Sequence, residues 1–378
     1  MAAVSTKRSR MAASVFSSQG WPYLLVPFIP LALVLEWLHA APVAVFVASA
    51  LGVIPTAALM GRATEELAER AGPGIGGLLN VTFGNAPELI IALFALAGGL
   101  HEVVKASLIG SIIGNILLVL GAAMVVGGAR RERQHFDRTM ANAQSSMLLL
   151  AGVAMAMPAI FELVEGQGLP SPGAARVGYD SPVEMLSLAV AVILISSYAF
   201  GLLFSLRTHR DLFNPERTER GGRRHGWSVR RSVLMLAVAG VAVGVMSELL
   251  VGSISDAAKS VGLSQFFIGA IVVAFVGNAA EHWVAVLVAA KDKMDLAVNI
   301  AIGSSAQIAL FVAPVLVLVS FVLGPSPMAL VFNGFELGAV FLAILIATHV
   351  TNEGESTWFE GVQLLAVYAV LGLAFLFA

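Results

Sequence analysis

The chain has 378 residues, of which 58% are hydrophobic and only 12% are charged, and its mean hydropathy is +0.87. Soluble proteins carry about 25% charged residues, so this composition excludes an ordinary soluble domain and predicts contact with lipid. The net charge of −2 gives no basic surface for nucleic acid, and we expect no such partner. The absence of cysteine excludes disulfides, thiolate metal sites and cysteine nucleophiles.

From the N-terminus, the chain begins with a short basic tail, residues 1–21, that lacks the apolar core of a cleaved signal peptide. A helix needs about 20 mostly apolar residues to cross a bilayer. Breaks that are charged or rich in Gly and Pro separate eleven predicted spans, at residues 22–40, 41–61, 74–99, 104–127, 139–161, 182–206, 231–252, 263–290, 295–323, 327–349 and 357–378. The predicted fold is an all-α polytopic membrane protein.

The basic residues predict the orientation of these helices, because Lys and Arg gather on the cytoplasmic side of a membrane. With the N-terminus in the cytoplasm and eleven crossings, 19 of the 22 basic residues fall on that side, leaving Lys105, Arg176 and Lys259 on the other. We therefore expect the C-terminus on the opposite side. Residues 207–230 are then a basic cytoplasmic linker.

Two parts of the chain share one pattern at a constant offset. A shift of 193 residues superposes two motifs without a gap, namely Gly84-Asn85-Ala86 with Glu88 on Gly277-Asn278-Ala279 with Glu281, and Ile109-Gly110-Ser111 on Ile302-Gly303-Ser304. The two glutamate helices run in opposite directions in the predicted topology. The sequence thus predicts two inverted five-helix repeats, 41–206 and 231–378, after an additional first helix at 22–40. Inverted repeats are typical of secondary transporters, with a shared site near the bilayer midplane.

The first motif carries groups that suit a cation. A charged side chain near the bilayer centre costs at least about 2.5 kcal/mol, so Glu88 needs a partner or a function. Gly84 and Asn85 lie on the same helical face as Glu88, and Gly84 leaves room for another backbone to approach. Pro87 has no N–H, so we expect the carbonyl of Phe83 to lose its helical partner and to seek another ligand. Carboxylate, amide and carbonyl oxygens together suit Ca²⁺.

The second motif supplies Gly277, Asn278 and Glu281 but lacks the proline. Two carboxylates at the axis between the repeats match the charge of one divalent cation. Without the cation, two neighbouring carboxylates in a low dielectric cannot both stay ionised cheaply, so protons and Ca²⁺ compete for the same oxygens. A purely structural glutamate, buried against a partner, is the alternative for one motif and is a poorer explanation of two.

Ser111 and Ser304 each follow their glutamate by 23 residues, on the next helix. Each can hydrogen-bond a carboxylate or bind an ion, and the small residues around each serine also serve helix packing. Asn115 and Gln307 are further polar groups nearby that do not align under the shift.

Three other polar residues at membrane depth are weaker candidates. Glu248 and Glu336 lie towards the ends of predicted helices, where each is either a gate or a side chain that reaches for water. His282 points about 100° around the helix from Glu281, which favours packing over ion binding. The sequence contains no HExxH zinc motif and no P-loop, so we expect neither an enzyme nor an ATP-driven pump.

Four segments resemble the core repeats of the CAX-type Ca²⁺/H⁺ exchangers of the cation/Ca²⁺ exchanger superfamily: GGLLNVTFGNAPELI, ASLIGSIIGNILLVLG, SQFFIGAIVVAFVGNAAEHWVAV and IGSSAQIALFVAP. The resemblance extends from about residue 22 to 378. It implies eleven transmembrane helices, alternating access, and Glu88 and Glu281 as shared ligands of the cation and the proton. It also implies further groups along the ion path: Asn85, Asn278, Ser111, Ser304, Gln307 and the backbone oxygens of Gly84 and Gly277. The segment SELLV makes Glu248 a candidate for ion or proton access.

The chain departs from the family pattern in two places. Its linker is basic where some members have an acidic stretch, so regulation through an acidic segment is not expected. The segment NEGESTW, residues 352–358, stands where an Asp-Gly pair is expected.

The predicted function is exchange of Ca²⁺ for protons across a lipid bilayer, in the plasma membrane if the source is prokaryotic, with Ca²⁺ as transported substrate and no cofactor. A Na⁺-coupled exchanger of the same fold and a passive cation channel are the alternatives. Sodium coupling predicts exchange that requires Na⁺, and a channel predicts flux without countertransport. The sequence leaves open the choice among Ca²⁺, Mn²⁺ and Cd²⁺, the stoichiometry and the oligomeric state.

Overall fold

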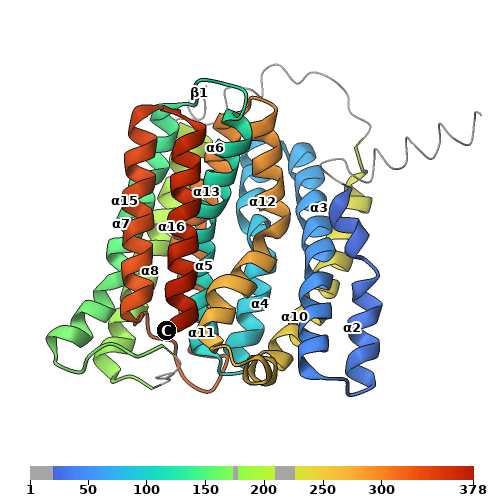
Figure 1. Cartoon of the computed structure of the whole chain (residues 1–378), viewed down its shortest axis with the longest axis vertical. Coiled ribbons are helices and arrows are strands. Elements are labelled where there is room, and N and C mark those ends of the chain that lie inside the picture. The colour runs from blue at the N-terminus through green and yellow to red at the C-terminus, as the bar shows by residue number, and fades with distance from the viewer. Residues whose placement is uncertain (1–19, 173–177, 209–225) are drawn as a thin grey trace, which may run out of the picture.

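The computed structural model describes residues 20–172, 178–208 and 226–378. It is an all-helical bundle with one pair of two-residue strands (Figure 1). Most of the predicted basic tail and basic linker lies outside the described residues. The elements in chain order are η1 (Trp21–Leu25), α2 (Phe28–Trp37), α3 (Pro42–Gly84), α4 (Ala86–Ala97), α5 (His101–Ile113), η2 (Gly114–Val119), α6 (Leu120–Gly128), β1 (Gln134–His135), α7 (Arg138–Val164), α8 (Ser181–Leu203), η3 (Phe204–Thr208), α10 (Val229–Val261), α11 (Gln265–Phe267), η5 (Ile268–Val273), α12 (Ala274–Ala290), α13 (Met294–Gln307), η6 (Ile308–Val312), α14 (Ala313–Ser320), α15 (Gly334–Glu353), β2 (Glu355–Ser356) and α16 (Trp358–Phe377).

Among the described residues, nine helices are long and apolar enough to cross a membrane, and a bent pair, Leu78–Gly84 with α4, makes a tenth candidate. The first predicted span, 22–40, corresponds to the shorter apolar helical stretch Trp21–Trp37. The prediction of a multi-pass all-α membrane protein is confirmed. The exact number of eleven spans stays a prediction.

Several helices continue beyond the apolar segments that predicted them. α3 runs through the charged residues after position 61, and α10 extends to Val261 instead of ending near residue 252. α10 ends where Gly262 takes a left-handed conformation with φ 70°, a common helix stop. Hydropathy marks only the part of a helix that lies in lipid, so it misses polar turns that continue into water.

One predicted span begins later than the sequence indicated. The prediction of a helix from residue 327 is wrong, because α15 begins at Gly334 and residues 327–333 form neither helix nor strand. This irregular segment is largely buried, and neighbouring helices bind its backbone: Ser320 accepts the N–H of Met328, and Ser187 accepts the N–H of Leu330. An irregular backbone is tolerated inside a membrane protein when protein groups satisfy it.

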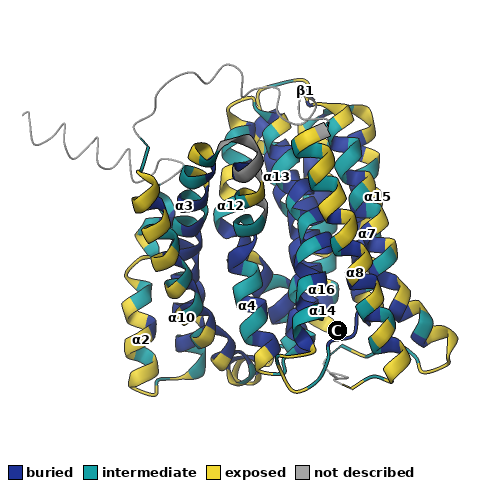
Figure 2. Ribbon diagram, turned by 180° about the vertical axis from the view of Figure 1, so that it is seen from behind, coloured by how far each residue is buried: buried dark blue, intermediate teal, exposed yellow. Residues whose placement is uncertain are grey.

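The helices form a buried centre with lipid-facing helices around it. α10 packs along α3, and α2 packs on both of them at one side of the bundle (Figure 1). α7 packs against α8 and α15 at the other side. The largest fully buried side chains concentrate on α5, η2 and α6, whereas α2 shows exposed apolar residues outward (Figure 2). This distribution places polar groups on α4, α5, α12 and α13 inside the protein.

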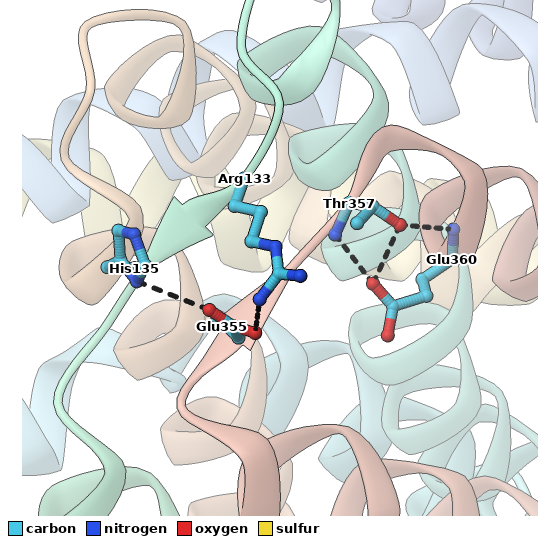
Figure 3. A network of polar contacts seen from close by, with 5 residues as sticks. All are labelled: Arg133, His135, Glu355, Thr357 and Glu360. Carbon is cyan, nitrogen blue, oxygen red and sulfur yellow. Dashed lines mark hydrogen bonds and ion pairs between the residues drawn. The ribbon is translucent and has the colours of Figure 1, made fainter.

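Three loops that the sequence places in the cytoplasm meet at one end of the bundle. β1 pairs antiparallel with β2, and Glu355 contacts both Arg133 and His135, the latter at 3.7 Å between Oε2 and Nδ1 (Figure 3). Asp292 belongs to the third loop, and its Oδ1 forms an ion pair with Nε of Arg131 at 3.0 Å. The C-terminus lies at the opposite end from β1 (Figure 1).

Candidate ion-binding site

The first motif forms a break between two helices. α3 ends at Gly84, Asn85 follows it, and the segment Leu78–Gly84 meets α4 at 44°. Pro87 lies in the first turn of α4, where the missing N–H costs nothing and the fixed φ suits the helix start. The expected free carbonyl of Phe83 is not found, because this oxygen accepts the N–H of Asn85 as the chain tightens at the break.

Glu88 lies in the first turn of α4, where the positive end of the helix dipole favours a carboxylate. An ideal Cβ on Gly277 of α12 would lie 3.3 Å from the Cγ of Glu88, so this glutamate packs against the glycine. Glu281, one turn further along α12, is near enough for its charge to act on Glu88. Among the described residues, no heavy atom from another part of the chain lies within 4 Å of an ideal Cβ on Gly84, so the close approach expected there is not found.

Both asparagines of the motifs have their amide nitrogens occupied. Asn85 donates from Nδ2 to Oε1 of Gln307 at 2.6 Å. Asn278 donates from Nδ2 to Oγ of Ser111 at 3.0 Å and to the carbonyl of Ala274 at 2.9 Å. The Oδ1 atoms of both asparagines are buried and accept no hydrogen bond in the described part of the chain.

The two glutamates differ in their hydrogen bonds. Ser304 donates to Oε2 of Glu281 at 3.1 Å, as one of the two predicted roles of this serine requires. Ser111 binds Asn278 instead of Glu88, and Oε2 of Glu88 is buried without a hydrogen-bond partner among the described residues. A serine–carboxylate bond is therefore present in the second motif only.

Three buried acceptor oxygens without partners thus belong to the two motifs, on Asn85, Glu88 and Asn278. An unpaired buried polar atom costs about 1–3 kcal/mol, which a bound cation removes. Hard oxygen ligands of this kind fit a divalent cargo such as Ca²⁺. Within residues 20–172, 178–208 and 226–378, no group of three or more His, Cys, Asp or Glu side chains could hold a metal, so a cation here needs amide or backbone oxygens as well.

His282 is buried beside this region. Its Nε2 lies 3.1 Å from Oδ1 of Asn115 on the π-helical segment η2. The contact joins α12 to η2 and fits the predicted packing role of His282. It also gives Asn115 a partner other than the ion.

The two remaining candidates lie elsewhere. Glu336 is buried in the first turn of α15, where Oε2 accepts the N–H of Asn333 at 2.8 Å and Oδ1 of Asn333 accepts the N–H of Glu336 at 2.9 Å. This reciprocal cap makes Glu336 a structural residue. Glu248 is exposed on α10 and makes no hydrogen bond or ion pair with any described residue, so its role in access stays a prediction.

Sequence reasoning missed Glu65. This residue of α3 is exposed, and its charge acts on Glu281 of α12, which packs against α3. The sequence assigned it to a cytoplasmic segment between spans. The continuation of α3 past residue 61 is the signal that connects it to the site.

Comparison with known proteins identifies one family. The family model described as "Sodium/calcium exchanger protein" matches residues 41–207 and 231–377. Two relatives named Ca²⁺/H⁺ antiporter are 45% identical over 372 residues (Synechocystis sp.) and 44% identical over 371 residues (Aphanothece halophytica). The matches cover 94% and 93% of this chain and 96% and 95% of those relatives. The solved structure of native YfkE has a TM-score of 0.78 and 39% identity, and the match covers 94% of this chain and 100% of that one.

A multi-pass helical bundle with two neighbouring glutamates on separate helices is typical of membrane proteins that move ions. The family model matches both predicted repeats, at residues 41–207 and 231–377, and so narrows this class to one family of exchangers. The chain belongs to the sodium/calcium exchanger family, as a CAX-type Ca²⁺/H⁺ antiporter.

Proposed function

We propose that this protein is a secondary active transporter that exchanges Ca²⁺ for protons at Glu88 and Glu281. One observation carries the proposal: Glu88 of the first motif packs against Gly277 of the second, one helical turn from Glu281, and the two motifs hold three buried oxygens without partners among the described residues, on Asn85, Glu88 and Asn278. The names of the relatives supply the cargo and the coupling ion. Two carboxylates bind either one divalent cation or protons, so each ion displaces the other as the site turns from one side to the other.

The proposal includes two inverted five-helix repeats, 41–206 and 231–378, after one additional helix at 22–40. Two features of the structure support this division. The π-helical segments η2 and η6 overlap under the 193-residue shift. Ser305 donates to the carbonyl of Ile112, the residue 193 positions before it, at 3.4 Å. A contact between two equivalent positions is expected at the axis that relates two repeats.

We further propose eleven crossings with the N-terminus in the cytoplasm and the C-terminus outside. The meeting of three predicted cytoplasmic loops at the end opposite to the C-terminus supports this topology (Figure 1). In the plasma membrane of a prokaryote, an inward proton gradient then drives Ca²⁺ out of the cell.

A Na⁺-coupled exchanger is the second candidate, because the description of the matching family names sodium. It shares the fold and the cation site and differs in the ion that displaces Ca²⁺. A passive channel differs from both by conducting without a counter-ion. These functions are separated by their dependence on Na⁺ and on the proton gradient.

The test uses the purified full chain in sealed liposomes with an acid interior and radioactive Ca²⁺ outside, in the absence of Na⁺. Uptake is followed with and without a protonophore for the wild type, Glu88→Gln and Glu281→Gln. We expect uptake that the protonophore abolishes and that each substitution lowers to the level of empty liposomes. Asp256→Asn, in a polar part of α10 away from the two motifs, is the control variant and should retain uptake.

Uptake that is indifferent to the proton gradient and appears only with internal Na⁺ would establish the sodium-coupled alternative. Uptake that needs neither a proton gradient nor internal Na⁺ would establish a channel. Full activity in both glutamine variants would remove Glu88 and Glu281 from the site.

A further inference from the structure

The two glycines of the repeated motifs have different surroundings although their sequences match. An ideal Cβ on Gly277 would lie 3.3 Å from Cγ of Glu88, which is tighter than ordinary contact. An ideal Cβ on Gly84 would meet no other part of the described chain within 4 Å. Glu88 of the first motif thus packs against Gly277 of the second, whereas Glu281 of the second motif does not contact Gly84 of the first.

The hydrogen bonds of the site show the same asymmetry. Glu281 accepts a bond from Ser304 in its own repeat, whereas Glu88 has no bond from Ser111. Ser111 instead accepts the amide N–H of Asn278 from the other repeat at 3.0 Å. The serine of the second motif therefore binds its own glutamate, whereas the serine of the first motif binds the asparagine of the other repeat.

Residue type does not explain these differences, because Gly, Asn, Glu and Ser occupy equivalent positions in both motifs. The residues beside the two glutamates do differ, since Pro87 stands opposite Ala280 and Leu89 stands opposite His282. Pro87 lies at the start of α4 after the 44° break, and His282 contacts Asn115. The groups whose contacts differ are nevertheless identical in both motifs, so conformation is left as the source of the asymmetry.

In a transporter made of inverted repeats, alternating access moves one part against the other around a fixed site. Two repeats that carry the same motif can therefore exchange their local arrangements when the site turns to the other side. If the two motifs exchange their glycine and serine contacts in this way, the second arrangement is fully specified.

We propose that Glu88 and Glu281 take turns against the glycine of the opposite motif: Glu88 against Gly277 in the state described, and Glu281 against Gly84 in the opposite-facing state. The serines exchange with them, so that Ser111 binds Glu88 and Ser304 binds Asn85 in the second state. Gly84 and Gly277 are positioning residues, because each makes room for the carboxylate of the other repeat. This inference rests on the proposed exchange function and adds which contacts open and close.

The absence of cysteine from the chain makes a direct test possible. The variant Gly84→Cys with Glu281→Cys forms a disulfide only if these positions approach to about 4 Å between Cβ atoms. The pair Glu88→Cys with Gly277→Cys tests the contact already present. Gly84→Cys with Ala285→Cys, one helical turn beyond Glu281, is the matched control. A protease site placed in the linker, residues 207–230, reports the disulfide, because the cleaved halves stay joined on a non-reducing gel.

We expect mild oxidation in membranes to join the halves in the 88–277 pair and in the 84–281 pair, and not in the control. Joining in the 88–277 pair alone would overturn the proposal, and so would joining in neither pair or equal joining in the control. The assay needs no transport, so its failure is separate from a failure of the proposed Ca²⁺/H⁺ exchange.

A second measurement compares Gly84→Ala with Gly277→Ala in the liposome exchange assay. If the site had only the arrangement described, Gly84→Ala should have no effect on exchange, because an added Cβ on Gly84 meets no other part of the described chain within 4 Å. The proposal predicts that both variants slow exchange about tenfold, since an added methyl in a packed contact disfavours one of the two required states. A wild-type rate in Gly84→Ala beside a slow Gly277→Ala would contradict it.

Discussion

At the scale of single residues, Gln307 holds the amide of Asn85 in place, because Oε1 of Gln307 accepts a hydrogen bond from Nδ2 of Asn85 at 2.6 Å. We expect Gln307→Ala to leave that amide without an acceptor and free to turn. Losing a buried partner costs about 1–3 kcal/mol, so the apparent KM for Ca²⁺ should rise about tenfold with a smaller change in the maximal rate. Flux into liposomes at increasing Ca²⁺ measures both quantities.

Ser305→Ala is the matched control for this prediction, since Ser305 lies on the same helix two residues away. Its hydroxyl donates to the carbonyl of Ala301 in its own helix at 2.9 Å and to that of Ile112 at 3.4 Å, and not to Asn85 or to either glutamate, so its removal should leave KM nearly unchanged. An equal rise of KM in both variants would mean that Gln307 acts through general packing. An unchanged KM in Gln307→Ala would mean that Asn85 does not need this acceptor.

The polar residues that meet at the candidate site could be selected from the sequence, whereas their contacts could not. The repeat at offset 193 selected Glu88 and Glu281, which the structure brings together, and spacing selected the serines. The partners depend on how two helices from different repeats meet. Ser111 binds Asn278 and not Glu88, and no spacing within one repeat contains that information.

At the scale of elements, Lys105 links α5 to the irregular segment 327–333 through a hydrogen bond. Its Nζ donates to the carbonyl of Val331 at 2.7 Å, and the charge of Glu336 in the first turn of α15 acts on it. All three residues are buried. Lys105→Met removes the hydrogen bond to Val331 and the buried positive charge on the side of Glu336, so we expect it to lower the free energy of unfolding by about 3 kcal/mol. Thermal unfolding in detergent measures the change.

The double variant Lys105→Met with Glu336→Gln separates charge from packing. Glutamine keeps the acceptor that the helix cap needs, so removing the second charge should recover part of the lost stability. A double variant that is as unstable as Lys105→Met, or less stable, would show that the Glu336 charge is not the cause.

Hydropathy could predict that residues 327–349 are an apolar stretch, but not where the helix within it begins. An apolar run is equally consistent with a helix and with an extended segment inside the protein. The helix start at Gly334 follows from the reciprocal cap of Asn333 and Glu336. The same limit explains α10, whose polar last turns are helical although they lie beyond the apolar window.

At the scale of the whole molecule, the orientation in the membrane is tested by the two ends of one helix. α7 spans 27 residues, about 40 Å at 1.5 Å per residue, which exceeds the bilayer core of about 30 Å. Glu132 and Gln167 are exposed just before and just after it, so they lie on opposite sides. Because 19 of the 22 basic residues fall on one side of the predicted topology, we expect Glu132 in the cytoplasm and Gln167 outside.

The natural lack of cysteine allows this prediction to be tested with two single substitutions and no background labelling. In intact cells, a membrane-impermeant thiol reagent should label Gln167→Cys and spare Glu132→Cys until the membrane is opened. The reverse pattern would place the loop joined by Glu355, Arg133 and His135 outside (Figure 3), and would reverse the direction of Ca²⁺ movement that the proton gradient drives. Labelling of both variants in intact cells would mean that α7 does not cross the membrane.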